Sequence, residues 1–232
     1  MAARITRTLF RLKSSGMEHP DQIRYHAIKL FENGQHQEAV SMFDRLIAVS
    51  DYTGDYAWRA QSLVALGRYR DALDDCELAM SKDPADPSAF TTAAFILSAT
   101  PPEELRDGSA ALDLIRHALE TTDTPSNWRI NSIAAAVHAE CGDFAQAERY
   151  ATMCANDSPP EMAQRFRERI QQYRDGIPYR ASAEDITSAS KIRDVNCMIC
   201  GAPAFMRWPP RDPNRQPRCV DCCSYDTSES AE

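Results

Sequence analysis

The sequence predicts a mainly α-helical solenoid of helical hairpins, closed by a capping helix and followed by a small module built around cysteines. Two observations carry this prediction. The first is a repeated pattern of a glycine, a ring-bearing side chain two residues later and an alanine three residues after that, found at Gly34–Ala39, Gly67–Ala72 and Gly142–Ala147. The second is a pair of Cys-x-x-Cys motifs near the C-terminus, at Cys197–Cys200 and Cys219–Cys222.

Length, charge and cysteine usage limit the class of protein. The chain has 232 residues, which suits one or two domains, and a formal net charge of −8, which argues against a general binder of polyanions. It contains no apolar run long enough to cross a bilayer, so we expect no membrane span. Cys76, Cys141 and Cys154 stand singly within helical patterns and form no disulfide framework. This usage predicts a reducing compartment, the cytoplasm.

Residues 1–18 form a basic N-terminal extension. Residues 1–16 contain four basic side chains and no acidic one. Ile5, Leu9, Phe10 and Leu12 lie among the basic residues, as in a short amphipathic presequence. We favour a simpler interpretation, in which this stretch is either a frayed extension or the product of an upstream start site, with Met17 as the real beginning.

The first two hairpins follow a simple physical logic. Each glycine pattern comes after one amphipathic helical stretch and opens another. Glycine permits the tight turn between the two helices, and the small alanine lets their backbones approach closely. In the second hairpin Asp83-Pro84 ends the repeat, because proline cannot continue a helix interior.

The third hairpin must hold an insertion, because the second and fourth glycines are too far apart for standard repeats. Its first helix is expected around Phe90, Ala94 and Leu97. Thr100-Pro-Pro102 should break that helix, and Asp107 is placed to cap the next one.

The fourth hairpin and the cap follow from apolar periodicity. Ile130, Ile133, Ala134 and Val137 have the i, i+3, i+4, i+7 spacing of one helix face. This register predicts a turn one residue longer than in the other hairpins. Pro159-Pro160 should start a final helix that covers the end of the array. Its apolar face comprises Met162, Phe166, Ile170 and Tyr173.

These features resemble the tetratricopeptide repeat (TPR) family over residues 19–175. The second hairpin matches best, at the aromatic, small and proline positions Tyr56, Ala60, Leu63, Gly67, Tyr69, Ala72, Ala79 and Pro84. The resemblance implies a non-catalytic scaffold for protein–protein interactions, with a groove formed by the first helix of each hairpin that binds a peptide or protein. The positions implied to line it are Arg24, Ile28, Phe31, Gln61, Val64, Phe95, Trp128 and Asn131.

The predicted groove has an alternative interpretation and one subtype that the sequence can test. The apolar members of the set would equally serve as packing between helices. The resemblance also allows a test for receptors of chaperone C-termini, which hold a carboxylate with convergent basic residues. The matching positions are Arg24, Ile28 and Trp58, and residues 88–98 contain no basic side chain. That subtype is therefore not expected.

The C-terminal part divides into three segments. We expect a polar linker at 176–195, a zinc-ribbon-like module at 196–225 and an acidic, disordered tail at 226–232. The spacing of Cys197, Cys200, Cys219 and Cys222 is that of a structural zinc site with one Zn²⁺ per chain. Four thiolates leave no open coordination position, so the metal would be structural rather than catalytic.

Two alternatives to a zinc site and one further role for the ribbon, as a nucleic-acid-binding adaptor, stay open. Cys-x-x-Cys-Gly also resembles the first knuckle of rubredoxin-type iron sites, although Cys223 stands where that family keeps its second glycine. A basic loop with an aromatic residue, Arg207-Trp208 to Arg218, has the ingredients of a nucleic-acid contact, which the acidic array opposes. The cysteines could also be unliganded in a disordered tail.

The sequence offers no catalytic motif. It has no nucleophile elbow, no phosphate-binding glycine loop and no His-x-x-x-His pair. Its five histidines are dispersed along helical patterns without an evident partner. We therefore expect a protein that is not an enzyme.

Overall fold

The computed structural model describes residues 19–50, 52–122, 127–182 and 184–186, and all regular structure in these ranges is helical. The α-helices are α2 (Pro20–Glu32), α3 (His36–Ile47), α4 (Gly54–Ala65), α5 (Tyr69–Lys82), α6 (Pro87–Ala99), α7 (Gly108–Thr121), α8 (Trp128–Glu140), α9 (Phe144–Asp157) and α10 (Pro160–Arg174). A short 3₁₀ helix, η1 (Glu103–Leu105), lies between α6 and α7.

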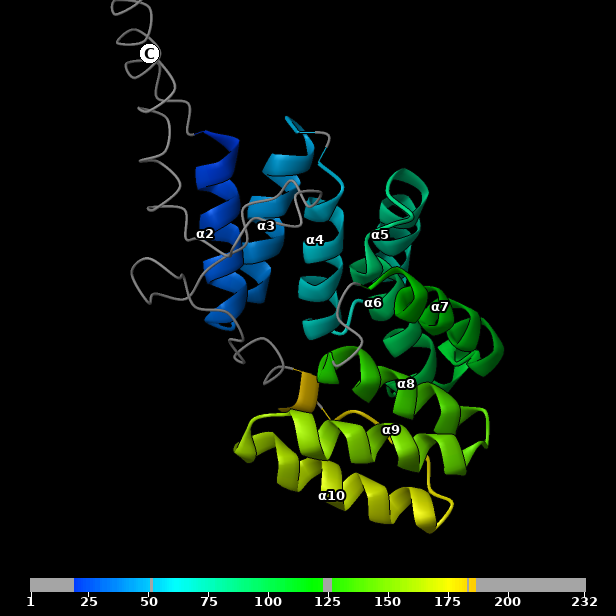
Figure 1. The fold of residues 1–232 in the computed structure, drawn as a ribbon. Coiled ribbons are helices and arrows are strands. Elements are labelled where there is room, and N and C mark those ends of the chain that lie inside the picture. The colour runs from blue at the N-terminus through cyan, green and yellow to red at the C-terminus, as the bar shows by residue number, and fades with distance from the viewer. Residues whose placement is uncertain (1–18, 51, 123–126, 183, 187–232) are drawn as a thin grey trace, which may run out of the picture.

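The helices form consecutive antiparallel hairpins that stack in chain order, as Figure 1 shows. The hairpins are α2/α3, α4/α5, α6/α7 and α8/α9, and α10 packs against α9. The first helix of each hairpin also contacts the first helix of the next, so α2, α4, α6 and α8 form a continuous inner wall. The predicted hairpin solenoid with a capping helix is confirmed for the described residues.

Buried alanines set the distance between the two helices of every hairpin. Each helix of a hairpin contributes an alanine that is at most 1% exposed, and the two alanines of a hairpin lie in the same buried cluster: Ala27 and Ala39, Ala60 and Ala72, Ala94 and Ala111, Ala136 and Ala147. A methyl group at the contact lets helix backbones approach more closely than a longer side chain would. Larger residues such as Phe43 and Ile115 fill the space beside these contacts.

The turns of three hairpins share one conformation. Gly34, Gly67 and Gly142 have φ of 78°, 73° and 79°, in the left-handed region that other residues rarely adopt. A methyl group added at any of them would meet no atom within 4 Å, so the requirement for glycine is conformational rather than steric. All three turns have the same length, because each helix pair is separated by residues 33–35, 66–68 or 141–143. The prediction of a longer fourth turn is therefore wrong.

The insertion lies where the sequence predicts it. Helix α6 ends at Ala99, the Thr100 hydroxyl donates to the Ile96 carbonyl at 2.7 Å, and two prolines follow. The Asp107 carboxylate then accepts a hydrogen bond from the Ala110 N–H at 3.0 Å and caps α7.

Bidentate arginine–aspartate pairs join neighbouring helices. Arg59 on α4 donates to both carboxylate oxygens of Asp75 on α5, at 2.8 and 2.6 Å. It also donates to Asp44 on α3 at 2.6 Å. Arg24 on α2 holds the buried Asp55 on α4 in the same way, at 2.6 and 2.9 Å. These two-point contacts orient one helix against the next.

The chain after α10 turns back onto the array within the segment predicted as a linker. The Ala181 N–H donates to the Ala99 carbonyl at 2.8 Å, which ties this return segment (residues 177–182) to the end of α6. Arg180 forms an ion pair with Glu140 at 2.6 Å. Tyr179 is buried, with the guanidinium of Arg169 3.6 Å from its ring centre. The return segment is therefore part of the packed structure.

Substituting Asp75 should lower the free energy of unfolding much more than substituting Asp44, although both carboxylates pair with Arg59. The Asp75 side chain is 4% exposed and that of Asp44 is 56% exposed. Asp75→Ala removes the buried partner and leaves part of the arginine charge uncompensated, so we expect a loss of about 2 kcal/mol of unfolding free energy. Asp44→Ala is the matched control and should cost about 0.5 kcal/mol or less. Urea unfolding followed by circular dichroism measures both, and equal losses would contradict this account.

Candidate functional site

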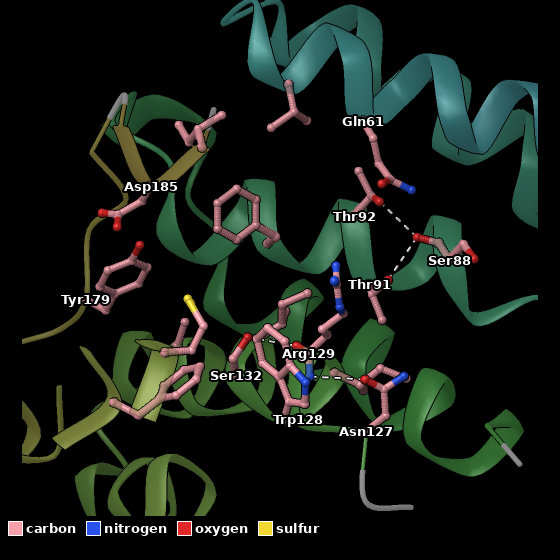
Figure 2. A pocket seen from close by; sticks show the side chains of 18 of the residues that line it. Gln61, Ser88, Thr91, Thr92, Asn127, Trp128, Arg129, Ser132, Tyr179 and Asp185 are labelled. Atoms are coloured by element: carbon pink, nitrogen blue, oxygen red, sulfur yellow. Dashed lines mark hydrogen bonds between the residues drawn. The ribbon is translucent and has the colours of Figure 1, made fainter. Parts of the chain in front are cut away.

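A cavity of roughly 380 Å³ opens on the inner side of the solenoid. Its lining comes from α2, α4, α6, α8 and α10, together with Tyr179, Asp185 and Ile186 after the last helix. Figure 2 shows Gln61 on one side, Ser88, Thr91 and Thr92 on α6, and Trp128 and Arg129 on α8. Five helices and the chain beyond α10 thus contribute to one concave site.

Aromatic rings form much of the apolar surface of the cavity. Trp128 at the start of α8 meets Phe166 of α10 edge to face, with ring centres 5.9 Å apart. Phe31 of α2 makes a similar contact with Trp58, at 5.6 Å. Phe95 of α6 lies between the two main buried clusters of the array and lines the cavity as well. Such walls suit apolar side chains of a ligand.

Hydroxyl and amide groups lie between these rings. The Thr91 and Thr92 hydroxyls donate to the Ser88 carbonyl at 2.9 Å, so their orientation is fixed by their own helix. The Asn127 side chain accepts a hydrogen bond from the Arg129 N–H at 3.0 Å and caps α8. Local hydrogen bonds therefore hold the polar lining in place before any ligand arrives.

Three arginines give the cavity a positive wall, although the whole chain has a net charge of −8. Arg129 lies on α8, and its guanidinium is 5.1 Å from the ring centre of Trp128. Arg165 and Arg169 lie on α10, where Arg169 packs between Phe166 and Tyr179 at 5.4 and 3.6 Å from their ring centres. A guanidinium over a ring face is attracted electrostatically by the ring.

Asp185 is the acidic counterpart of this wall. Its carboxylate lies 3.3 Å from the Arg165 guanidinium and accepts hydrogen bonds from the Ser182 N–H and hydroxyl at 3.0 and 2.8 Å. Burial by itself raises the pKa of Asp185, but the Ser182 hydrogen bonds and the Arg169 charge outweigh burial and hold this pKa below its ordinary value. The side chain is therefore charged at neutral pH.

Five of the eight positions implied by the family resemblance line the cavity: Phe31, Gln61, Val64, Phe95 and Trp128. The other three lie elsewhere. The Arg24 guanidinium is used in the pair with Asp55, Ile28 is buried in the cluster between α2 and α3, and Asn131 is 1% exposed. A position on the first helix of a hairpin is thus not enough to reach the cavity.

Sequence reasoning missed the contribution of α10 and of the chain after it. The basic residues of α10 lie beside the apolar face that the sequence assigns to the capping helix. This neighbourhood of basic and apolar residues could have indicated that α10 contributes to a binding surface. No sequence pattern indicated that Tyr179 and Asp185 line the cavity, because both follow the last predicted helix and lie outside its periodicity. The four cysteines of the predicted metal site, Cys197, Cys200, Cys219 and Cys222, lie outside the described residues.

Cys76, Cys154 and His117 lie outside the cavity lining. Burial raises the pKa of Cys76 and of Cys154 to about 12, so these two thiols stay protonated at neutral pH. His117 contacts the Pro84 carbonyl and lies on the ring of Phe90, away from the cavity lining. Within the described ranges no group of three or more His, Cys, Asp or Glu side chains is placed to hold a metal ion.

The helices of the described ranges include none with the length and apolar character that a bilayer crossing requires.

The fold is that of TPR proteins. The chain is similar to the crystal structure of TTC0263, described as a thermophilic TPR protein in Thermus thermophilus, with a TM-score of 0.56 and 16% identity over 74% of this chain and 88% of that one. Two structures of MamA, one of a point mutant and one of an MSR-1 form, match 74% of this chain and 96% and 98% of their own. Their TM-scores are 0.47 and 0.46, with 12% and 14% identity. No protein-family model and no curated protein matches the sequence.

The return segment offers a direct test of how firmly the end of the chain is held. Tyr179 is 8% exposed and Ile177 is 54% exposed, two residues earlier in the same segment. Tyr179→Ala removes a ring packed against Arg169 and α10, so we expect a loss of about 3 kcal/mol of unfolding free energy. Ile177→Ala should change it by about 0.5 kcal/mol or less. Urea midpoints report both, and a small effect of Tyr179→Ala would argue against the packed arrangement.

Proposed function

We propose that this protein is a non-catalytic interaction scaffold whose inner cavity binds an exposed peptide segment of a partner protein. The single observation that carries the proposal is the cavity itself, which lies on the inner wall formed by the first helix of each hairpin. Its rings can take apolar side chains, and its oriented hydroxyls, amides and arginines can fix the register of a backbone or a charged group. The TPR fold supports the same class of function, although a fold alone does not name a partner.

A scaffold function also accounts for what surrounds the cavity. The polar groups of the lining are held by local hydrogen bonds, so a ligand would meet a largely preformed site. The buried free thiols of Cys76 and Cys154 suit a reducing compartment, and we propose the cytoplasm.

Blocking the cavity should abolish peptide binding without harming the fold. A library of random peptides displayed on phage is selected on the immobilised full-length protein, and recovered peptides are measured by fluorescence anisotropy. Thr91 is partly exposed at the cavity surface, so Thr91→Arg places a long side chain inside it. We expect this change to weaken the recovered peptides at least about tenfold, or 1.4 kcal/mol.

The matched control is Thr152→Arg on α9. Thr152 is exposed, lies outside the cavity lining and donates to a carbonyl of its own helix, as Thr91 does. Its substitution should leave peptide affinity unchanged. Recovery of no peptide above background, or peptides that bind both variants equally well, would contradict the proposed function.

We further propose that the C-terminal module holds one structural zinc ion through Cys197, Cys200, Cys219 and Cys222. The support is their spacing in the sequence, which matches a four-thiolate site. When bound, the metal would supply the folding energy of a segment too small for its own core.

Elemental analysis of protein purified without added metal tests this assignment. We expect about one zinc per chain, lost in Cys197→Ser and in Cys219→Ser because a four-thiolate site needs every ligand. Cys76→Ser, which changes a buried cysteine of the array, should keep the metal. Iron with visible thiolate-to-metal absorption would support a rubredoxin-like centre instead, and protein without metal would refute both.

A further inference from the structure

The chain supplies one short segment to its own cavity. Asp185 and Ile186 belong to the cavity lining, and both follow the return segment that packs against α6 and α10. The Asp185 carboxylate lies 3.3 Å from Arg165. Ile186 packs against two buried clusters, one centred on α4–α6 and the other on α8–α10. The edge of the cavity next to Arg165, called the rim below, therefore accommodates an acidic residue followed by a branched aliphatic residue.

Several contacts fix the place where this pair is presented. The Ala181 N–H donates to the Ala99 carbonyl, and Tyr179 is held under Arg169. Ser182 and Asp185 then cap a single helical turn, in which the Ser182 hydroxyl accepts from the Asp185 N–H at 3.1 Å. Because the anchor lies only a few residues away, the pair has a high effective concentration at the rim.

The charge of the cavity fits an acidic ligand. The described lining contains Arg129, Arg165 and Arg169 and a single acidic side chain, that of Asp185. The Arg165 guanidinium also lies 3.9 Å from the Glu184 carboxylate, so the acidic groups at this wall come from the same short segment of the chain. A ligand that combines a carboxylate with an aliphatic side chain would satisfy both the arginines and the apolar rings.

We propose that the partner binds with an acidic residue followed by a branched aliphatic residue, and that Asp185 and Ile186 occupy this subsite until the partner displaces them. This proposal rests on the proposed function and names the chemistry of its peptide.

Displacement is physically accessible because Asp185 is more open to solvent than the anchor formed by Tyr179 and Ala181. The Arg165 and Asp185 side chains are 38% and 26% exposed, and ion pairs so open to solvent contribute little to stability. Tyr179 and Ala181 are buried, so they can stay in place while residues 184–186 leave. A partner segment then competes with residues 184–186 alone.

The test uses a fluorescent peptide with the sequence of residues 182–189, Ser-Ala-Glu-Asp-Ile-Thr-Ser-Ala, and the full-length protein. In the variant Asp185→Asn/Ile186→Ala the internal pair is weakened and the subsite becomes open. We expect the peptide to bind this variant at least about tenfold more tightly than the unmodified protein, because an occupied site lowers apparent affinity by the fraction that is open.

Two changes test the recognition itself. Arg165→Gln, added to the opened variant, should weaken the peptide at least about tenfold, whereas Arg174→Gln on the same helix should not. Arg174 is exposed, pairs with Glu148 and lies outside the cavity lining. A peptide with Gln and Asn in place of Glu184 and Asp185 should bind the opened variant as weakly as the acidic peptide binds the Arg165→Gln form. This last comparison needs no change in the receptor, so it holds even if Arg165→Gln fails to fold.

Each outcome decides the proposal. Equal affinity for the opened and unmodified proteins would refute the displacement, and equal binding of the acidic and amide peptides would refute recognition of the carboxylate. No binding to the opened variant would overturn the proposal as a whole. The proposed function is judged separately, because peptides recovered from the random library and lost in Thr91→Arg would support it in any of these cases.

Discussion

The close approach of two helix backbones across buried alanines is the contact on which the rest of this structure depends. Every hairpin has such alanines on both helices, from Ala27 and Ala39 to Ala136 and Ala147, and all of them are buried. A larger side chain would separate the helices and disturb the packing of neighbouring hairpins, because protein interiors do not tolerate extra volume without strain. Close hairpins in turn let α2, α4, α6 and α8 form one continuous inner wall.

The cavity on this wall combines contributions of two kinds. Rings on the first helices, such as Phe31 and Phe95, face it because the hairpins stack in register. The positive charge comes from α8 and from α10, whose role as a cap over the last hairpin also brings Arg165 and Arg169 to the cavity. One helix thus covers the end of the array and supplies part of the binding surface. The protein gains a basic site inside an acidic chain through this placement.

Local features of the fold were predictable because they depend on neighbouring residues. The left-handed conformations of Gly34, Gly67 and Gly142, the cap formed by Asp107 and the start of α10 at Pro160 all follow from rules that act over a single helical turn. The same reasoning erred where register over a longer distance mattered. It predicted a longer fourth turn, whereas all three glycine turns have the same length.

The sequence by itself therefore determined the hairpins, their turns and the alanine contacts, since helix periodicity, capping and turn chemistry are local properties of the chain. It also carries the cysteine spacing on which the zinc proposal rests. Only the tertiary structure decided which side chains share the cavity and that Asp185 meets Arg165 there. These encounters depend on the curvature of the whole stack and on the path of the chain after α10. Both arise from many small packing contacts between distant residues, which no short sequence pattern encodes.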